Sequence, residues 1–302
     1  MRVLVSGASG LIGTALCASL SNDGDEVVRL VRSTPSGPGE IFWDPANGLL
    51  EADQVEGFDA VVHLAGAGIG DKRWSESRRR LILDSRVGPT ELLAERLAAA
   101  NRKPAVFISA SAIGYYGEPD GPVTEADGPG DPSNYASFVP VAWEAATRAA
   151  EEAAIRTVHI RSGIVLAEKG GTLGKLLPLF KLGVGGKLGS GDTWWSWISL
   201  VDEVRAIKHL ITTPISGPVN LTSPNPVTNA ELTNALGKVL RRPAVFSVPR
   251  FALELVLGKE LAASLVFASA RVLPARLEQS GFEFRHPDIE SALRSLLDRP
   301  AQ

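Results

Sequence analysis

The chain has 302 residues, of which 44% are hydrophobic and 22% are charged, and its formal net charge is −3. These values are typical of a globular protein with a sizeable core, and the slightly acidic balance offers no basic surface for nucleic acid. The single cysteine, Cys17, excludes an internal disulfide and a cysteine-based metal site, and the histidines lack metal-ligand spacing, so no metal is expected. No apolar run reaches membrane-spanning length, and the first residues already read as a core strand rather than a signal peptide. A cytoplasmic location without a membrane partner is therefore expected.

The chain opens with an apolar run that leads directly into three evenly spaced glycines. Residues 2–6 predict a short buried strand, Gly7, Gly10 and Gly13 follow it, and a helical pattern begins at Leu11. In such a unit the first glycine permits the tight turn, the second lets the backbone approach a diphosphate, and the third lets helix and strand pack closely. Free N–H groups at the helix start attract the phosphates. The alternative is an ordinary glycine-rich turn, but the pattern favours a dinucleotide-binding site.

The end of the second strand indicates which dinucleotide binds. Residues 26–31 predict this strand, and Arg32 follows it where no Asp or Glu stands. A carboxylate at this position would hold the ribose 2′-hydroxyl of NAD, whereas an arginine accommodates the 2′-phosphate of NADP. The alternative is a solvated arginine on a loop. We expect NADP(H) as the cofactor.

Strand-like and helix-like patterns alternate along the first half of the chain. This alternation predicts an α/β fold, namely a doubly wound parallel sheet of the Rossmann type with helices on both faces. Further strands are predicted at residues 40–45, 58–66, 104–110 and 157–166, and helices at 75–100 and 143–154. The helix predicted at residues 75–100 should be interrupted near Gly88-Pro89, because proline cannot donate a hydrogen bond to the preceding turn. Ligands lie beyond the carboxyl ends of parallel strands, so residues 64–68 should flank the cofactor.

The composition changes after residue 166. Glycines and lysines crowd residues 170–191, which predicts a mobile loop system, either a lid over the site or a plain linker. An aromatic strand-like segment at 193–200, with most of its tryptophans expected in the core, and helices near 229–240, 251–257 and 288–298 complete the chain. We therefore expect a nucleotide-binding domain at 1–166, with strands added from 193–222, and a smaller substrate or lid region at 167–302.

Several local signatures occur together in this chain. They are Gly7-x-x-Gly10-x-x-Gly13, Asp59-Ala-Val-Val-His-Leu-Ala-Gly66, Asp71-Lys72-Arg73-Trp74, Ser85-Arg86, Ser109-Ala-Ser-Ala-Ile-Gly-Tyr-Tyr-Gly117, Trp143-Glu144, Arg161-Ser-Gly-Ile-Val-Leu166 and Trp197-Ile198. Over nearly the whole chain this set resembles the extended, atypical branch of the short-chain dehydrogenase/reductase superfamily. In particular it resembles the bacterial epimerase family proteins, which are related to a human short-chain dehydrogenase of family 39U. The carboxyl-terminal segment resembles the domain of unknown function of that family.

This resemblance implies a set of cofactor contacts. The matching positions are Gly7, Gly10, Leu11, Ile12, Gly13, Arg32, Leu64, Ala65 and Arg86. Arg86 lies on a predicted helix and could close an ion pair with the cofactor diphosphate. The alternative for Arg86 is a salt bridge within the protein to Asp84 or Glu91.

Reductases and epimerases of this superfamily use a serine, a tyrosine and a lysine four residues after that tyrosine. The lysine lowers the pKa of the tyrosine from about 10 toward neutrality, so that the phenol can exchange a proton with the substrate. None of the three tyrosines of this chain has that lysine: four positions after Tyr115, Tyr116 and Tyr135 stand Pro119, Asp120 and Val139. The usual tyrosine–lysine pair is absent from the sequence, and a substitute cation would have to come from Lys72, Arg73 or Arg161.

Part of the catalytic set remains by resemblance. Ser111 matches the serine of the family, Tyr116 matches its Tyr-Gly pair with one residue inserted, and Tyr135 lies near the usual acid. Tyr116 could instead be a wall of the substrate pocket, and Tyr135 a packed or surface aromatic. Lys72 and Arg73 follow the cofactor strand and could clamp an anionic substrate group, or could equally be solvated loop charges.

The sequence is compatible with two different functions. The first is an NADP(H)-dependent oxidoreductase or epimerase that holds a small polar substrate between the nucleotide-binding domain and the glycine-rich segment. The second is a sensor that binds NADPH, reports it through a partner and has lost its chemistry with the lysine. The sequence leaves the substrate and the oligomeric state open.

Overall fold

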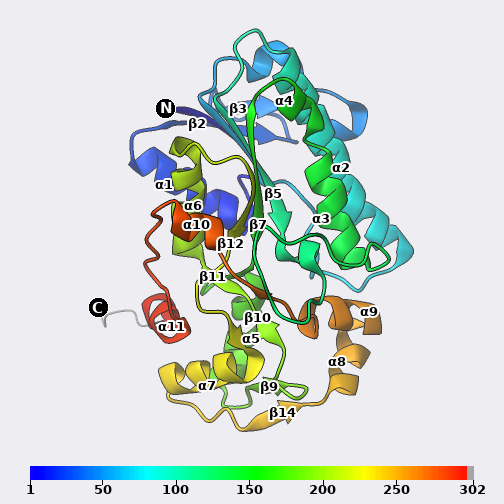
Figure 1. Ribbon diagram of the computed structural model, residues 1–302, viewed down its shortest axis with the longest axis vertical. Coiled ribbons are helices and arrows are strands. Elements are labelled where there is room, and N and C mark those ends of the chain that lie inside the picture. The colour runs from blue at the N-terminus through cyan, green and yellow to red at the C-terminus, as the bar shows by residue number, and fades with distance from the viewer. Residues whose placement is uncertain (298–302) are drawn as a thin grey trace.

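Seven parallel strands form the central sheet, in the order β12-β7-β5-β4-β1-β2-β3. Their bounds are β1 Arg2–Ser6, β2 Glu26–Val31, β3 Glu40–Phe42, β4 Ala60–His63, β5 Val106–Ala112, β7 Arg156–Ser162 and β12 Gly217–Leu221. The computed structural model describes residues 1–297 (Figure 1). The strand order reverses at β1, since β2 and β3 lie on one side of it and all later strands on the other. The predicted doubly wound α/β fold is confirmed, and its reversal point is where such sheets bind ligands.

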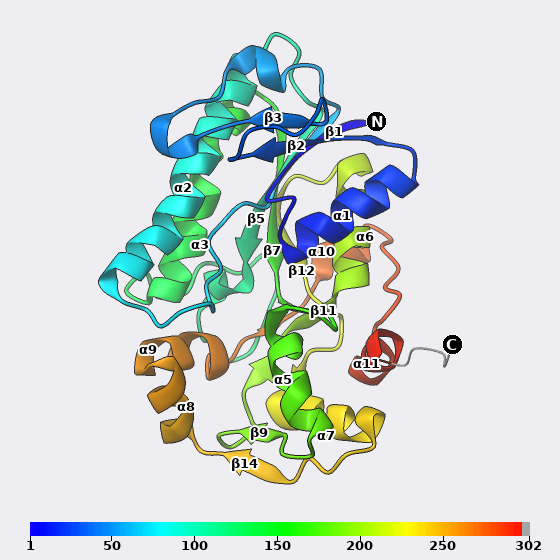
Figure 2. The same ribbon diagram turned by 180° about the vertical axis from the view of Figure 1, so that it is seen from behind.

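Helices cover both faces of the sheet (Figures 1 and 2). On one face lie α1 (Leu11–Asn22), α6 (Leu200–Thr212) and α10 (Ala275–Gln279), and on the other lie α2 (Glu76–Ala99), α3 (Tyr135–Ala145) and α4 (Arg148–Glu152). Successive side chains of a strand point to opposite faces. Val3 and Val5 of β1 therefore pack in one core with Leu16 of α1, whereas Leu4 packs in a second core with Leu93 of α2.

The α2 helix continues through Pro89, so the interruption predicted at Gly88-Pro89 is wrong. An interior proline destabilises a helix by about 3 kcal/mol. The turns around and after Pro89 bury Leu92, Leu93 and Leu97, and burial of such side chains contributes roughly 1.5–3 kcal/mol each. The free energy gained by burying these leucines therefore outweighs the cost of the proline.

The single helix predicted at residues 143–154 is two helices, α3 and α4. The first begins at Tyr135, earlier than predicted, because the side chain of Asn134 accepts a hydrogen bond from the backbone N–H of Ala136 at 3.0 Å. Tyr135 consequently lies in the first turn of a helix, not before one.

A smaller lobe lies beyond the carboxyl ends of the sheet, at the lower end of Figure 1. Its helices are α5 (Gly171–Lys181), α7 (Asn229–Leu240), α8 (Arg250–Leu257), α9 (Lys259–Leu261) and α11 (Ile289–Leu297). Its short strands pair as β8 (Ile164–Leu166) with β11 (Trp197–Ser199), β9 (Gly186–Leu188) with β14 (Phe246–Val248), and β10 (Trp194–Trp195) with β13 (Val227–Thr228); β6 (Pro122–Val123) pairs with β15 (Arg271–Val272) nearby. The predicted carboxyl-terminal helices are confirmed as α7, α8 and α11, and residue 298 of the last prediction lies outside the described residues.

Part of the glycine-rich segment 170–191, for which the composition predicts a mobile loop system, forms regular secondary structure. Residues 171–181 form α5, whose Phe180 is buried in one core with Trp195 and Trp197, so these two tryptophans pack as expected. Glycine also permits close contact here, because a Cβ on Gly186 would lie 2.0 Å from the carbonyl oxygen of Phe246.

The chain passes between the two lobes more than once. After β11 it returns to the sheet lobe as α6 and β12, and it does so again as α10. The sheet lobe thus contains segments from both sides of residue 166. Within residues 1–297, no helix combines the length and the apolar character needed to cross a bilayer.

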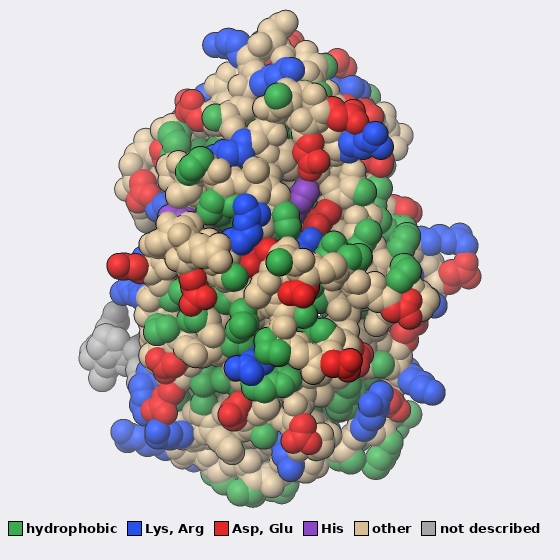
Figure 3. Space-filling model, viewed as in Figure 1, with side chains coloured by type: hydrophobic (Ala, Val, Ile, Leu, Met, Phe, Trp, Pro, Cys, Tyr) green, Lys and Arg blue, Asp and Glu red, His purple; other side chains and the backbone are tan. Residues whose placement is uncertain are grey.

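Positive and negative side chains alternate over the face shown in Figure 3, and hydrophobic side chains gather at its lower end. The lower lobe exposes several large apolar side chains, among them Phe246, Phe251 and Leu255, and α8 has no buried residue.

Candidate functional site

The turn between β1 and α1 requires glycine at two positions. Gly7 has a φ of +68°, and a Cβ there would lie 2.6 Å from the carbonyl carbon of Leu64 and 2.8 Å from the nitrogen of Ala65. A Cβ on Gly13 would lie 2.2 Å from the carbonyl oxygen of Gly7. The N–H of Gly10 donates to that same oxygen at 3.0 Å. The turn is therefore held closely between α1 and the segment after β4.

The α1 helix begins without a side-chain cap. Gly10 occupies the N-cap position, and the first turn contains no acidic residue. The backbone N–H groups at the helix start, including those of Leu11 and Ile12, have no acceptor within the helix and add to its positive dipole end. A helix start of this kind, beside a glycine turn at the carboxyl edge of a parallel sheet, fits a diphosphate.

Arg86 is a buried cation that no carboxylate of residues 1–297 neutralises. Only 9% of the residue is exposed, its Nη1 donates to the carbonyl of Ile82 at 2.9 Å, and its guanidinium lies 4.9 Å from the ring centre of Trp143. A Cβ on Gly66, just beyond β4, would lie 3.2 Å from Cζ of Arg86. Within residues 1–297 the alternative salt bridge to Asp84 or Glu91 is not formed.

The charge of Arg86 survives this burial. Desolvation lowers the pKa of Arg86 to about 10, so the guanidinium is still protonated at neutral pH. A buried charge without a partner is unfavourable, and an anion bound at the end of β4 would supply one. These residues therefore fit the diphosphate of a dinucleotide.

Arg32 lies directly after β2, at the same edge of the sheet. It is exposed, and within the described chain its guanidinium has neither a hydrogen-bond partner nor an ion-pair partner. It is therefore free to donate two parallel hydrogen bonds to a phosphate.

Ser111 lies at the end of β5 in a buried polar network. Its Oγ donates to Oε1 of Glu144 at 2.7 Å. Arg161 of β7, which pairs in register with Ser111, donates from Nε to Oε1 and from Nη2 to Oε2 of Glu144, both at 2.8 Å. Nη1 of Arg161 donates to the hydroxyl of Tyr116 at 2.9 Å, and its guanidinium lies 3.4 Å from the ring centre of Tyr115. Of the three cations considered from the sequence, Arg161 is the one that contacts a candidate tyrosine hydroxyl.

The two candidate tyrosines have hydroxyls that are already engaged. Tyr116 is 3% exposed, and its hydroxyl donates to Oδ1 of Asn220 at 2.7 Å while it accepts from Arg161. Burial raises the pKa of Tyr116 to about 12, although Arg161 acts in the opposite direction. The Tyr135 hydroxyl donates to the backbone carbonyl of Arg79, and burial raises its pKa as well. Both phenols are neutral near pH 7, and this arrangement argues against proton transfer by Tyr116.

Lys72 and Arg73 differ in their contacts. Lys72 is exposed and has no partner among the described residues. Arg73 donates from its guanidinium to the backbone carbonyls of Leu255 and Val256 at the end of α8. Arg73 thus connects the loop after β4 with the lower lobe, and Lys72 alone offers a free charge.

Sequence reasoning missed the role of Glu144 and also missed a second buried carboxyl. Glu203 of α6 is fully buried; Ser162 donates to its Oε1 at 2.6 Å, and its Oε2 has no partner within residues 1–297. Burial raises the pKa of Glu203 to about 8. Its position shows no signal in the sequence, whereas Glu144 stands in the Trp143-Glu144 motif.

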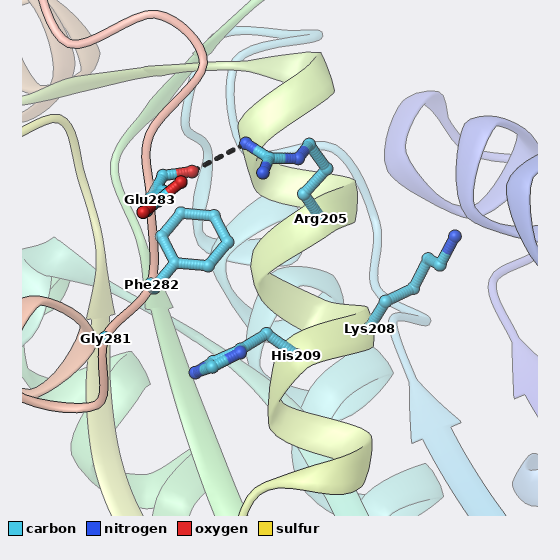
Figure 4. A pocket seen from close by; sticks show the side chains of 6 residues that line it. All are labelled: Arg205, Lys208, His209, Gly281, Phe282 and Glu283. Atoms are coloured by element: carbon cyan, nitrogen blue, oxygen red, sulfur yellow. Dashed lines mark hydrogen bonds between the residues drawn. The ribbon is translucent and has the colours of Figure 1, made fainter.

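One open cleft lies away from this site. It measures about 380 Å³ and is lined by Arg205, Lys208 and His209 of α6 and by residues 281–283 (Figure 4). Lys208 donates to Ser19 and pairs with Asp23 at the carboxyl end of α1, which is the end opposite the glycine turn. This cleft is therefore not the dinucleotide site.

The sheet order, the glycine turn and the uncapped helix start define a dinucleotide-binding α/β protein. The sequence matches the model of the NAD dependent epimerase/dehydratase family over residues 3–222, and that of a domain of unknown function (DUF1731) over residues 248–296. The chain belongs to the NAD-dependent epimerase/dehydratase family, and the resemblance noted from its motifs is confirmed.

Relatives match over nearly the full length. The epimerase family protein ML0860 of Mycobacterium leprae is 42% identical over 302 residues, which cover 99% of this chain and 97% of that protein. The human epimerase family protein SDR39U1 is 34% identical, and its crystal structure with NADPH superposes with a TM-score of 0.89 over 98% of this chain and 99% of that one. A nucleoside-diphosphate sugar epimerase from Corynebacterium glutamicum is 37% identical, with a TM-score of 0.81 over 98% of this chain and 58% of that one.

Proposed function

We propose that this protein is an NADP(H)-dependent oxidoreductase or epimerase that acts on a small polar substrate. The observation that carries the proposal is the glycine turn with its uncapped helix start, beside the buried Arg86, which has no carboxylate partner among residues 1–297. Gly7, Gly10, Gly13, Leu11 and Ile12 would hold the diphosphate from the turn and the helix start. Leu64 and Ala65 would flank the coenzyme at the end of β4. The NADPH in the human relative supports this assignment.

Arg32 supports NADP(H) over NAD(H). Its free guanidinium lies at the end of β2, where the adenosine ribose of a bound dinucleotide belongs. We expect Arg32→Ala to weaken NADPH binding roughly 10- to 100-fold, as the loss of hydrogen bonds to a charged group would. Binding of NADH should change much less.

Calorimetry with both coenzymes tests the assignment. Arg29→Ala is the matched control, because it removes an equal charge from β2, three residues before Arg32, at a residue that pairs with Glu40. It should leave the preference for NADPH intact. Equal losses for both coenzymes in Arg32→Ala would mean that Arg32 does not meet the 2′-phosphate.

The substrate would lie at the carboxyl ends of β4, β5 and β7, between the sheet lobe and the lower lobe. When bound, the coenzyme supplies hydride transfer. Ser111 would contact the reacting oxygen, and Lys72 could attract an anionic group at the rim. Oxidation of protein-bound NADPH by a panel of small carbonyl compounds tests turnover.

A specific observation favours a second candidate, an NADPH-binding regulatory protein. The chain lacks the tyrosine–lysine pair, and the hydroxyls of Tyr116 and Tyr135 are engaged within the protein. If NADPH binds at micromolar affinity or better and no compound of a broad panel is turned over in either direction, the regulatory function replaces the enzymatic one.

A further inference from the structure

We infer that Ser111 and Glu144 form the proton relay of the reaction, with Ser111 as the group that contacts the substrate oxygen and Glu144 as the proton acceptor behind it. This inference rests on the proposed function, since a relay needs a reaction to serve. In this relay a serine hydroxyl and a carboxylate take the place of the missing tyrosine–lysine pair.

The hydrogen bond between the two residues fixes what Ser111 can do. Its hydroxyl has one proton, and that proton is donated to Oε1 of Glu144 at 2.7 Å. Toward a bound molecule, Ser111 can then only accept a hydrogen bond. The matching substrate group is a hydroxyl, not a carbonyl. In this arrangement the site would take an alcohol beside oxidised coenzyme.

Arg161 holds the carboxylate in a single orientation. Its planar fork donates two parallel hydrogen bonds of 2.8 Å to Glu144, and its side chain is 3% exposed. Paired contacts of this geometry fix the orientation of the carboxylate, so that Oε1 stays within reach of the Ser111 hydroxyl. The guanidinium is itself fixed from the other side, where it lies 3.4 Å from the ring centre of Tyr115 and donates to the Tyr116 hydroxyl.

The tyrosines cannot serve in the same way. The hydroxyl hydrogen of Tyr116 is donated to Asn220, and one acceptor position of its oxygen receives Arg161. The hydroxyl of Tyr135 donates to a backbone carbonyl. Ser111 is the candidate hydroxyl whose donor proton already points at an anionic acceptor.

The proton step balances within these residues. The O–H bond of the substrate breaks and its proton bonds to Oγ of Ser111, while the original Ser111 proton moves to Oε1 of Glu144. The carboxylate becomes a carboxylic acid, and the substrate oxygen keeps the electron pair that forms the new C=O bond. The carbinol carbon is oxidised as its C–H hydrogen leaves with two electrons to NADP⁺, which is reduced. Reversal of the relay returns the proton when a carbonyl is reduced again.

Turnover of secondary alcohols with NADP⁺, followed by the absorbance of reduced nicotinamide, tests the relay. Ser111→Ala leaves the Glu144–Arg161 pair intact and should lower kcat by about 10²- to 10⁴-fold, which is the usual contribution of proton transfer. Its NADP⁺ affinity should stay within threefold of wild type, roughly the size of a sub-kilocalorie change. Glu144→Gln should lower kcat to a similar extent, and Ser111→Thr, which keeps a hydroxyl, should recover most of the rate.

Ser109→Ala is the matched control, because Ser109 lies on the same face of β5 and is also buried, and among residues 1–297 its hydroxyl donates only to the backbone carbonyl of Ala110, at 3.5 Å. It should leave kcat unchanged. Full turnover in Ser111→Ala, or loss of turnover in Tyr116→Phe without loss in Glu144→Gln, would overturn the relay while the enzymatic function stands. Failure of wild-type protein to turn over any alcohol or carbonyl, with tight coenzyme binding, would overturn the proposed function and the relay together.

Discussion

Nε of Arg73 donates a hydrogen bond to the backbone carbonyl of Val256 at 2.9 Å, although the two residues are 183 positions apart in the sequence. A second nitrogen of the same guanidinium donates to the carbonyl of Leu255. Nearby, Nζ of Lys175 in α5 donates to the carbonyl of Gly70 at 3.0 Å. The loop after β4 is thus tied to two helices of the lower lobe, which gives the arginine of the Lys-Arg-Trp motif a structural reason.

The first prediction concerns this connection. Arg73→Ala removes the hydrogen bonds at the carboxyl end of α8, each worth about 0.5–1.5 kcal/mol. Amides of residues 252–258 should exchange faster with solvent, roughly tenfold, while amides of the central sheet keep their rates. Hydrogen–deuterium exchange with mass spectrometry measures this. Lys72→Ala is the control, since the neighbouring Lys72 has no partner among residues 1–297. Unchanged exchange across α8 would contradict the structural role.

How far the sequence determines the site depends on the kind of contact. The turn at Gly7 and Gly13 can be predicted from the sequence, because the spacing of the glycines already indicates where the backbone must pass too closely for a Cβ atom. The ion pair between Glu144 and Arg161 cannot be predicted from the sequence. The two residues belong to different elements, and their contact depends on how α3 packs against β7. The fold is accordingly easier to predict than the chemistry.

The errors in the fold have a common cause. Residues 170–191 were expected to form a loop system because glycine often marks flexible chain, yet this segment contains α5, and Gly186 of β9 packs closely against β14. Pro89 was expected to interrupt a helix because proline cannot donate a hydrogen bond to the preceding turn, yet burial of Leu93 and Leu97 keeps the helix continuous. In both places tertiary packing overrides the local preference of the residue.

The second prediction tests the glycine turn. Gly13→Ala places a Cβ 2.2 Å from the carbonyl oxygen of Gly7 and must displace α1 from the turn. We expect NADPH affinity to fall by at least about 100-fold, since the helix start would no longer face the diphosphate. Gly88→Ala is the control: a Cβ there meets nothing within 4 Å, and the change should stabilise α2 by about 0.5–1 kcal/mol. Calorimetry and thermal unfolding measure both effects. Tight binding by Gly13→Ala would disprove the role of the turn.

The third prediction concerns the pH dependence of stability. In the unfolded chain Glu203 titrates near 4.5, whereas burial raises its folded-state pKa to about 8. The folded protein therefore binds more protons between these values, and its free energy of unfolding should fall as pH rises from about 4.5 to about 8. The titration of Glu203 lowers the free energy of unfolding by at most roughly 5 kcal/mol over this range. Glu203→Gln should remove it, so the variant should gain stability over wild type with rising pH.

Urea unfolding at about pH 5 and about pH 9 measures this difference, which follows from the proton linkage. Glu278→Gln is the matched control, because Glu278 is exposed and its substitution should leave the pH dependence of wild type in place. Parallel pH profiles for wild type and Glu203→Gln would show that the buried carboxyl does not titrate in this range.

The fourth prediction separates a ligand-binding role of Arg86 from a structural one. A buried guanidinium without a carboxylate partner destabilises the free protein, whereas bound diphosphate would neutralise it. Arg86→Met keeps the length of the side chain and removes the charge. The free energy of unfolding of the coenzyme-free variant should therefore lie within about 1 kcal/mol of the wild-type value, because the lost contacts with Ile82 and Trp143 offset the relief of the buried charge.

Thermal stabilisation of Arg86→Met by saturating NADPH should largely disappear, since the shift in melting temperature scales with affinity. Arg86→Lys, which keeps the charge but not the fork, should retain part of the shift. A strongly destabilised Arg86→Met protein that still binds NADPH as wild type does would assign Arg86 to the fold alone.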